Sequence, residues 1–275
     1  MAERSAAIVL AGGESERMGT AKAQLEWHGS TLLRRAAGLV GRVVDGPVVV
    51  VGADGQALPA LPAAVEIARD ARAGRGPLQG LAAGLAAIGG RAEIVFVTGV
   101  DAPLLHPALV AHVLRCLRPE DDVALPRVDG FAQPLAAAYR TSVAAQLSAL
   151  IDGGQLAAGA LTASIRAREL DEPALLSDGA VAALDPMLDS LRNLNTPGEY
   201  EAARARPAPA VTTRVAGGAS HDIQAATLGA AARATGVELR AGVVAKLSGD
   251  GSLDDPEDPL AEGDSLIFEA VAGRS

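Results

Sequence analysis

Three short runs of apolar residues constrain the fold of this 275-residue chain more than any other feature. They lie at Ser5–Leu10, Pro47–Asp54 and Ala92–Val100, and each is bounded by glycine or aspartate. Runs of this length between turn residues are typical of strands that are buried on both faces of a sheet. The chain is therefore expected to build its core around a sheet that is covered on both sides.

Segments with helical spacing separate and follow these runs, at Thr31–Val40, Leu78–Ile88 and Pro107–Leu117. The alternation of strand and helix predicts an α/β fold with a mixed, mostly parallel sheet and helices on both faces. Ligands of such sheets bind at the carboxyl ends of the strands. The residues that follow the three runs would therefore meet at one edge: Leu10–Gly13, Gly52–Asp54 and Asp101.

Composition excludes several classes of function. A net charge of −9 and an aromatic content of 2% argue against nucleic acid as a partner, since neither a basic surface nor stacking platforms are available. One cysteine, Cys116, excludes a disulfide framework and fits a reducing compartment. The four histidines lack metal-ligand spacing. No apolar run reaches about 18 residues and no signal peptide precedes the first strand, so we expect a cytoplasmic protein without a membrane segment.

The sequence changes character at Glu201–Val211, where a Pro-Ala-Pro stretch suits a linker. We therefore divide the chain into residues 1–206 and 207–275. The second part reads as strand, helix, strand and strand, and this pattern predicts a small α+β domain. The expected elements are Val211–Gly217, Thr227–Thr235, Val243–Leu247 and Ser265–Val271.

The segment LAGGESERMGTAK, from Leu10 to Lys22, is the richest in chemistry. Glycines at positions 12 and 13, directly after a strand, let backbone N–H groups approach a phosphate chain closely. Arg17 and Lys22 would add positive charge there. The segment has neither the Walker A spacing nor the dinucleotide-binding fingerprint. A glycine-rich turn with solvated charges is the alternative interpretation.

The pattern LAGGxxxRMGxxK resembles the signature of the molybdenum cofactor guanylyltransferases, the MobA-like branch of the nucleotidyltransferases. Further segments match that family in order: GPLQGLAAGL (76–85), VTGVDAPLL (97–105), QPLAAAY (133–139) and NLNTPGEYE (193–201). The resemblance spans about residues 5–205. It implies the Rossmann-like nucleotidyltransferase fold.

For the phosphates and the metal, the resemblance implies that Lys22 neutralises a triphosphate, with Arg17 beside it. Asp101 corresponds to the Mg²⁺ ligand, and an N-cap of the following helix is its alternative role. Asn193 or Asn195 would face the metal or the substrate. The loop that binds phosphate and nucleotide would consist of Leu10, Ala11, Gly12 and Gly13.

For the base and the second substrate, the resemblance places Asp70 beside guanine, where a carboxylate accepts from both N1–H and the exocyclic amine. Gly52 could contact the nucleotide through its backbone only. The base-contacting loop would hold Gly76, Pro77 and Leu78, and Gln133 and Pro134 would face the pterin.

The implied activity is Mg²⁺-dependent transfer of GMP from GTP to molybdopterin, with release of pyrophosphate. A cytidylyltransferase that uses CTP on the same cofactor is one alternative, and a catalytically degenerate nucleotide- or pterin-binding scaffold is another. Two residues depart from the family pattern: Ala21 replaces an aspartate beside the lysine, and Val100 replaces a cysteine before Asp101. Loss of the aspartate is the feature that favours the scaffold.

The end of the chain, Asp258–Ser275, resembles the β-grasp sulfur carriers of the MoaD/ThiS family. Those carriers end in Gly-Gly, whereas here Gly273 is followed by Arg274 and Ser275, so the tail lacks the group that carries sulfur. The resemblance implies a β-grasp module for docking to molybdoenzymes or to other proteins of cofactor biosynthesis. A stabilising appendage is the alternative.

Overall fold

Parallel pairing of the three apolar runs forms the centre of the molecule. Strand β1 (Ser5–Leu10) pairs in parallel with β4 (Val48–Ala53) on one edge and with β6 (Ile94–Gly99) on the other. Every residue of β1 and β6 is buried. This confirms the prediction of strands covered on both faces. The computed structural model describes residues 3–12, 21–70, 76–239, 243–248 and 251–270.

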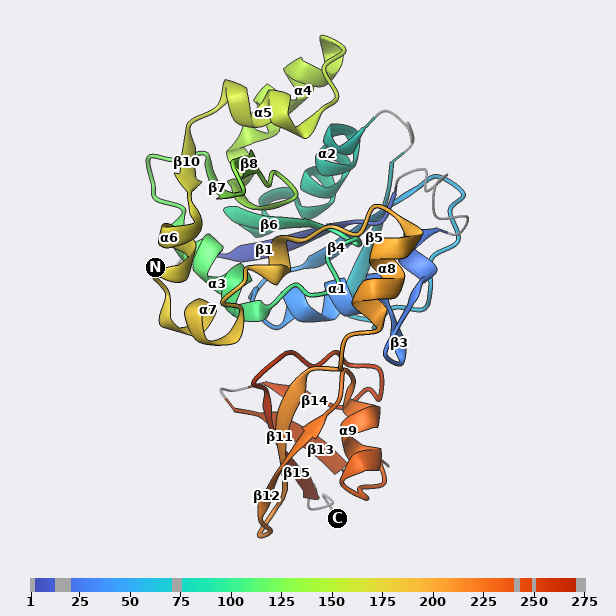
Figure 1. The fold of residues 1–275 in the computed structure, drawn as a ribbon. Coiled ribbons are helices and arrows are strands. Elements are labelled where there is room, and N and C mark those ends of the chain that lie inside the picture. The colour runs from blue at the N-terminus through green and yellow to red at the C-terminus, as the bar shows by residue number, and fades with distance from the viewer. Residues whose placement is uncertain (1–2, 13–20, 71–75, 240–242, 249–250, 271–275) are drawn as a thin grey trace.

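Further strands complete an eight-stranded mixed sheet, in the order β10-β7-β9-β6-β1-β4-β5 with β8 on β7 (Figure 1). Strand β9 is antiparallel to both of its neighbours, whereas the other pairs along this order are parallel. The additional strands are β5 (Val65–Asp70), β7 (Val123–Val128), β8 (Phe131–Ala132), β9 (Ala136–Arg140) and β10 (Ala167–Leu170).

Helices cover the two faces because alternate residues of β1 point in opposite directions. Ala7 and Val9 join the core beneath α1 and α3, whereas Ile8 and Leu10 join the core beneath α2. The first face carries α1 (Leu32–Gly41), α3 (Pro107–Cys116), α6 (Glu172–Leu176) and α7 (Gly179–Leu184). The second face carries α2 (Pro77–Ile88), α4 (Ala144–Asp152) and α5 (Ala158–Ser164).

A smaller cluster lies beside α1. Trp27 packs there against Tyr200 of helix α8 (Pro197–Arg204). The remaining local elements are the 3₁₀ helices η1 (Lys22–Gln24), η2 (Gly89–Arg91), η3 (Thr141–Val143) and η4 (Asp189–Leu191), and the hairpin strands β2 (Glu26–Trp27) and β3 (Ser30–Thr31).

The predicted linker at Glu201–Val211 began too early, because α8 continues to Arg204. A capping box of Thr196 and Glu199 fixes the start of this helix, and Tyr200 is buried on one of its faces. These interactions outweigh the weak helical signal of the segment.

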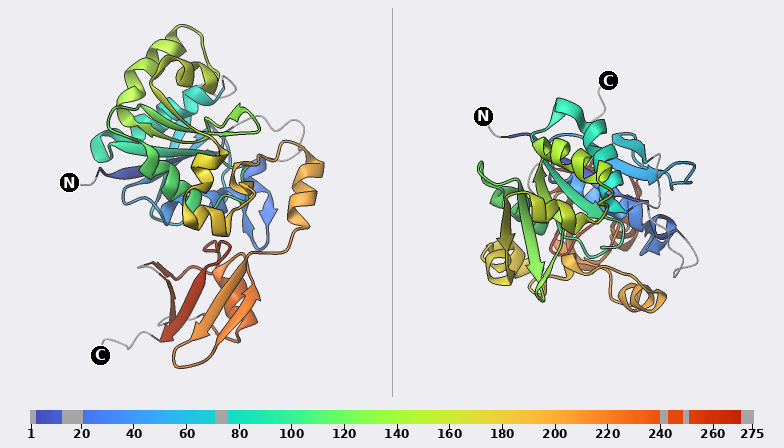
Figure 2. Two further views of the ribbon diagram at one scale, coloured as in Figure 1. Left: turned by 60° about the vertical axis from the view of Figure 1, so that its left-hand side comes forward. Right: turned by 90° about the horizontal axis from the view of Figure 1, so that it is seen from above.

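Residues 210–270 form a second unit with its own sheet, in the order β12-β11-β15-β13-β14 (Figures 1 and 2). One helix, α9 (Leu228–Ala234), packs on it, and Leu228, Leu266 and Phe268 fill the core between them. The α+β expectation is therefore confirmed. The strands are β11 (Ala210–Val215), β12 (Ser220–Gln224), β13 (Val243–Leu247), β14 (Ser252–Leu253) and β15 (Ser265–Ala270).

Of the helices in the described ranges, none combines the length and the apolar character needed to cross a membrane.

The contact between α2 and β1 yields a stability prediction. A Cβ atom at Gly84 would lie 2.7 Å from Cδ1 of the buried Ile8. We expect Gly84→Ala to lower the free energy of unfolding by about 1–3 kcal/mol, because the side chain overpacks the core. Gly159→Ala, in α5 with open space around its Cβ, is the matched control and should add about 0.5–1 kcal/mol. Urea titration of both variants measures the difference, and equal effects would contradict the packing argument.

The edge of the sheet yields a pH prediction. Asp122, before β7, accepts two side-chain hydrogen bonds from Arg166, before β10, at 3.0 and 2.9 Å, and these lower the pKa of its carboxyl. A lowered pKa stabilises the fold above the unfolded value of about 3.8, and this contribution disappears as the pH falls through the folded value. We expect Asp122→Asn to lower the Tm at pH 7 and to approach the wild type in acid. The exposed Glu120, as Glu120→Gln, should show a smaller difference at pH 7.

Candidate functional site

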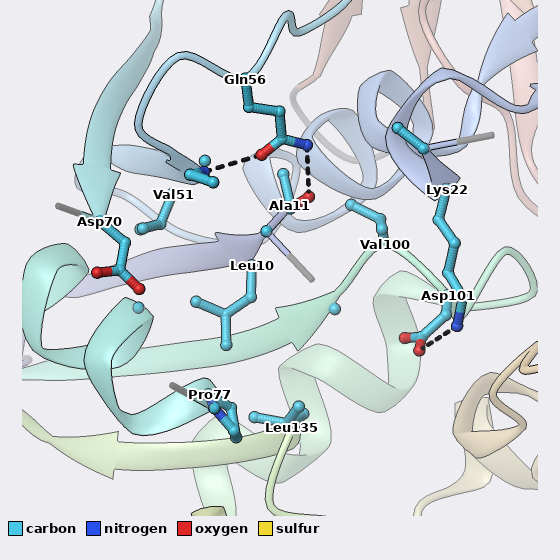
Figure 3. A pocket seen from close by; sticks show the side chains of 17 residues that line it. Leu10, Ala11, Lys22, Val51, Gln56, Asp70, Pro77, Val100, Asp101 and Leu135 are labelled. Carbon is cyan, nitrogen blue, oxygen red and sulfur yellow. Dashed lines mark hydrogen bonds and ion pairs between the residues drawn. The ribbon is translucent and has the colours of Figure 1, made fainter. Parts of the chain in front are cut away.

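A cavity of about 420 Å³ opens at the carboxyl ends of β1, β4 and β6 (Figure 3). The start of α2 and the 3₁₀ helix η1 close its sides, so five segments that are distant in sequence meet there. This is the edge at which the strand pattern predicts a ligand.

Nine of the residues singled out from the sequence line this cavity: Leu10, Ala11, Gly12, Lys22, Gly52, Asp70, Gly76, Pro77 and Asp101. Leu78 is not among the lining residues, because helical geometry turns its side chain into the core, where it is 1% exposed. Gln133, Pro134, Asn193 and Asn195 also fall outside the lining, although Asn195 contacts the lining residue Lys22. Gly13 and Arg17 lie outside the residues that the structure describes.

Lys22 and Asp101 form an ion pair at the cavity, with Nζ 3.2 Å from Oδ2 (Figure 3). The same ammonium group lies 3.3 Å from Oδ1 of Asn195. Only 20% of the lysine side chain and 27% of the aspartate side chain are exposed. The three residues come from η1, from the end of β6 and from the start of α8, so the fold joins elements up to 173 residues apart.

The role of Asp101 as a helix cap is excluded by its surroundings. His106 caps α3, since its Nδ1 accepts a hydrogen bond of 3.0 Å from the amide of Ala108. The backbone carbonyl of Asp101 accepts from the amide of Leu194 at 2.7 Å. The turn is therefore fixed through its backbone, and the Asp101 carboxylate faces the cavity.

Gln56 is a cavity residue that the sequence analysis missed. Its Oε1 accepts from the amide of Ala53 at 2.8 Å, and its Nε2 donates to the carbonyl of Ala11 at 2.9 Å (Figure 3). The side chain thus joins the ends of β4 and β1. Nothing in the polar loop after β4 marks this glutamine in the sequence.

Gly52 can contact a ligand only through its backbone, because its surroundings crowd the position of a side chain. A Cβ atom at this position would lie 3.0 Å from Nη1 of Arg69 and 3.3 Å from Oε1 of Gln56. Both side chains are held by hydrogen bonds to the loop, so they leave no space for a larger residue.

Gly76, which lines the cavity directly before α2, packs closely against the backbone of Leu156. Its φ is +90°, and a Cβ atom would lie 2.7 Å from the carbonyl oxygen of Leu156. Only glycine fits both constraints. Asp70, at the end of β5, lines the cavity with Gly76 and Pro77 (Figure 3).

The donor set at Lys22 fits a hard divalent cation. Asp101 and Asn195 each direct one oxygen at the ammonium group of Lys22. The two oxygens therefore already surround one positive charge. The described part of the chain contains no cluster of three or more His, Cys, Asp or Glu residues with metal-binding geometry. Mg²⁺ typically takes one or two protein ligands and completes its shell with water and phosphate oxygens, which agrees with a sparse site.

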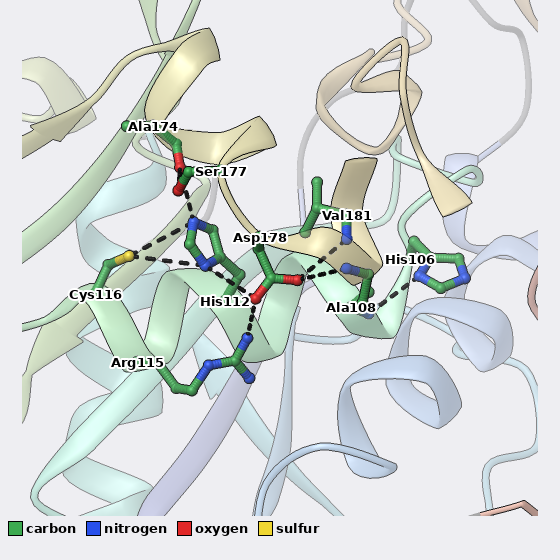
Figure 4. Close-up of polar contacts among 10 residues, drawn as sticks. His106, Ala108, His112, Arg115, Cys116, Ala174, Ser177, Asp178 and Val181 are labelled. Atoms are coloured by element: carbon green, nitrogen blue, oxygen red, sulfur yellow. Dashed lines mark hydrogen bonds and ion pairs between the residues drawn. The ribbon is translucent and has the colours of Figure 1, made fainter. Parts of the chain in front are cut away.

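A second polar cluster links α3 to α6 and to the start of α7 (Figure 4), and its labelled residues do not line the cavity. Nε2 of His112 is 3.1 Å from the carbonyl of Ala174, and Nδ1 of His112 is 3.5 Å from Oδ2 of Asp178. Cys116 is half-buried, and burial raises the pKa of its thiol. The cysteine therefore stays protonated and packs beside His112, at 3.6 Å.

Comparison with known proteins adds to this geometry. The family model described as "MobA-like NTP transferase domain" matches residues 7–171. A probable molybdenum cofactor guanylyltransferase of Mycobacterium ulcerans is 37% identical over 201 residues, which cover 72% of this chain and 92% of the relative. One from Mycobacterium tuberculosis is 40% identical over 160 residues, which cover 57% and 78%.

Solved structures share the fold at lower identity. Molybdopterin-guanine dinucleotide biosynthesis protein A from Archaeoglobus fulgidus superposes with a TM-score of 0.57 and 21% identity, over 72% of this chain and 96% of that one. The 2-C-methyl-D-erythritol 4-phosphate cytidylyltransferase from Thermus thermophilus gives 0.54 and 18%, over 74% and 98%.

The Gln56 contacts predict a local effect that needs no ligand. In Gln56→Ala the amide of Ala53 loses its acceptor, worth about 1 kcal/mol, so its hydrogen exchange should become roughly five-fold faster. Gln24→Ala is the matched control, because Gln24 also donates to a backbone carbonyl, that of Ala57, but does not line the cavity. Equal exchange of the Ala53 amide in both variants would contradict the bridging role.

Proposed function

Because the chain belongs to the MobA-like NTP transferase domain family, we propose that it is a molybdenum cofactor guanylyltransferase. It transfers GMP from GTP to molybdopterin and releases pyrophosphate. The observation that carries this proposal is the Lys22–Asp101–Asn195 cluster at the edge of the cavity.

Lys22 and the backbone at Gly12, after β1, bind the triphosphate of GTP. An oxygen of the molybdopterin phosphate attacks the α-phosphorus of GTP, and the bond from that phosphorus to the β-phosphate bridging oxygen breaks. Negative charge then grows on pyrophosphate, where the Lys22 ammonium and the Gly12 backbone stabilise it. The reaction is a single displacement and needs no covalent intermediate on the protein.

Asp101 and Asn195 are the residues that would hold Mg²⁺, since their oxygens share one cationic contact. The ion, when bound, neutralises charge on the phosphate oxygens. Lys22 is in reach of both oxygens and has a flexible four-carbon stem. The same ammonium group that contacts Asp101 and Asn195 can therefore also contact the phosphates of the nucleotide.

Asp70 favours guanine over cytosine. A carboxylate accepts from both N1–H and the exocyclic amine of guanine, whereas cytosine presents one amine beside the lone pair of N3. Gly76 and Gly52 line the same cavity and offer only backbone groups to the nucleotide. These features support GTP rather than CTP as the nucleotide.

Ala21 is the observation that favours a second candidate, a nucleotide- or pterin-binding scaffold without turnover. It lines the cavity beside Lys22, where the family pattern carries an aspartate. A site with one carboxylate less binds a divalent cation more weakly.

The second unit fits a β-grasp module, with one helix on a five-stranded sheet in which β11 and β15 are parallel. We therefore keep the division into residues 1–206 and 207–275 as part of the proposal. Docking to a molybdoenzyme is the role that its resemblance to the sulfur carriers supports. The residues after Ala270 lie outside the described ranges.

Pyrophosphate release with GTP, molybdopterin and Mg²⁺ tests the proposed activity. We expect Asp101→Asn and Lys22→Ala to lower kcat/KM by about 10²-fold or more, because each removes charge that acts on the phosphates. Asp152→Asn, on the exposed end of α4, is the control and should retain wild-type turnover.

Thermal denaturation with each nucleotide separates the alternatives. GTP at about 100 times its Kd should add about 2.7 kcal/mol of stability, and CTP at the same concentration should add less. A larger shift with CTP would indicate a cytidylyltransferase. Stabilisation by GTP without turnover, in the wild type, would favour the scaffold.

A further inference from the structure

Three arginines bind the acidic segment of the second unit, which comprises residues 254–264: Arg34 and Arg35 of α1, and Arg42, which directly follows this helix. Arg34 pairs with Asp255, and Arg42 makes two hydrogen bonds to the Asp264 carboxylate, at 2.8 and 2.6 Å. Only 7% of the Arg34 side chain is exposed. The second unit is therefore docked on α1 by partly buried charges and is more than a tethered appendage.

Close packing reinforces this contact. A Cβ atom at Gly38 of α1 would lie 2.5 Å from Cγ of Pro259, so helix and segment touch without a gap. Gly263 lies as closely against Leu184 of α7. The acidic segment thus contacts two helices of the first unit.

Arg35 connects the acidic segment to the turn that carries Asp101. Its Nε donates to the carbonyl of Pro103 at 2.6 Å, and its Nη1 donates to the carbonyl of Leu260 at 2.9 Å. The side chain is buried, and burial lowers its pKa to about 10, so the guanidinium remains charged at neutral pH. A buried cation needs both acceptors, and one of them belongs to the second unit.

His106 makes a second connection at the other end of the same turn. Its Nδ1 accepts from the Ala108 amide, so the proton resides on Nε2, which donates to the carbonyl of Glu262 at 2.9 Å (Figure 4 shows the Ala108 contact). Its backbone amide donates to Oγ of Ser190 at 2.9 Å.

We propose that the second unit positions Asp101 for catalysis. The carbonyls of Leu260 and Glu262 bind Arg35 and His106, and these two side chains fix the Asp101 turn, which comprises residues 101–106. Arg35 holds Pro103, two residues after Asp101, and His106 ends the turn. Both are positioning residues, since neither lines the cavity. The proposal rests on the proposed function only in naming Asp101 as the residue whose placement matters for turnover.

Loss of the link should loosen the turn. In Arg35→Met the Pro103 carbonyl loses its donor, and the amides of Leu105 and Leu194, which bind the carbonyls of Ala102 and Asp101, are exposed more often. We expect their hydrogen exchange to become about ten-fold faster. We also expect kcat for guanylyl transfer to fall on the order of 10- to 100-fold, with a higher Mg²⁺ requirement and an unchanged KM for GTP.

Arg42→Met, at the C-cap of the same helix, is the matched control. It removes a comparable bond to the acidic segment, at Asp264, but has no contact with the turn. Both arginine variants should lower the Tm, whereas exchange at Leu105 and Leu194 should respond to Arg35→Met alone. A purely structural role would give both variants the same pattern.

A change made within the second unit tests the same link from the other side. In Gly263→Ala a Cβ atom would lie 2.4 Å from Cδ2 of Leu184, so the acidic segment and the Leu184 side chain must move apart. Its control is Gly217→Ala, which has the same left-handed φ, +79° against +74°, and open space around it. We expect Gly263→Ala to reproduce the exchange pattern of Arg35→Met and Gly217→Ala to leave it unchanged.

The outcomes separate this proposal from the proposed function. Wild-type exchange at Leu105 and Leu194 in both Arg35→Met and Gly263→Ala would overturn the positioning role. Faster exchange in both variants, in a protein that transfers no guanylyl group, would support the link and overturn the activity instead.

Discussion

Burial of β1 on both faces and pairing on both of its edges is the constraint on which the rest of the structure depends. The strand has no exposed residue, so its register with β4 and β6 is fixed by the core on either side. This register determines where the three strands β1, β4 and β6 end at the edge of the sheet. The positions of Gly12, Gly52 and Asp101 follow from it, and with them the shape of the cavity.

The elements predicted from the sequence are those whose signal is local. Uninterrupted apolar runs identify β1, β4 and β6, and the helices between them have clear periodicity. By contrast, β5 mixes polar and apolar residues without a regular alternation at the edge of the sheet, and β7 contains Pro126. Such strands form because a neighbour supplies hydrogen bonds, and the sequence does not show which neighbour that is.

The residues of the candidate site also fall into those that a local sequence pattern predicts and those that it does not. Gly12, Lys22 and Asp101 follow strong local patterns, and the resemblance to a nucleotidyltransferase family added Asp70 and Asn195. Gln56 and Arg35 have no pattern of their own: each acts through backbone carbonyls that the fold brings near. Leu78 shows the opposite case, since it belongs to a matching motif but helical geometry turns it into the core.

Helix α1 is buried on two sides, by the core of the first unit and by the acidic segment of the second. One side contributes Leu33 and Val40 to the core of the first unit, and the other carries the arginines that the acidic segment covers. Deleting the second unit would remove the Leu260 carbonyl from Arg35 and Asp255 from Arg34. The two units therefore share an interior surface, and the sequence of α1 has to satisfy both of them.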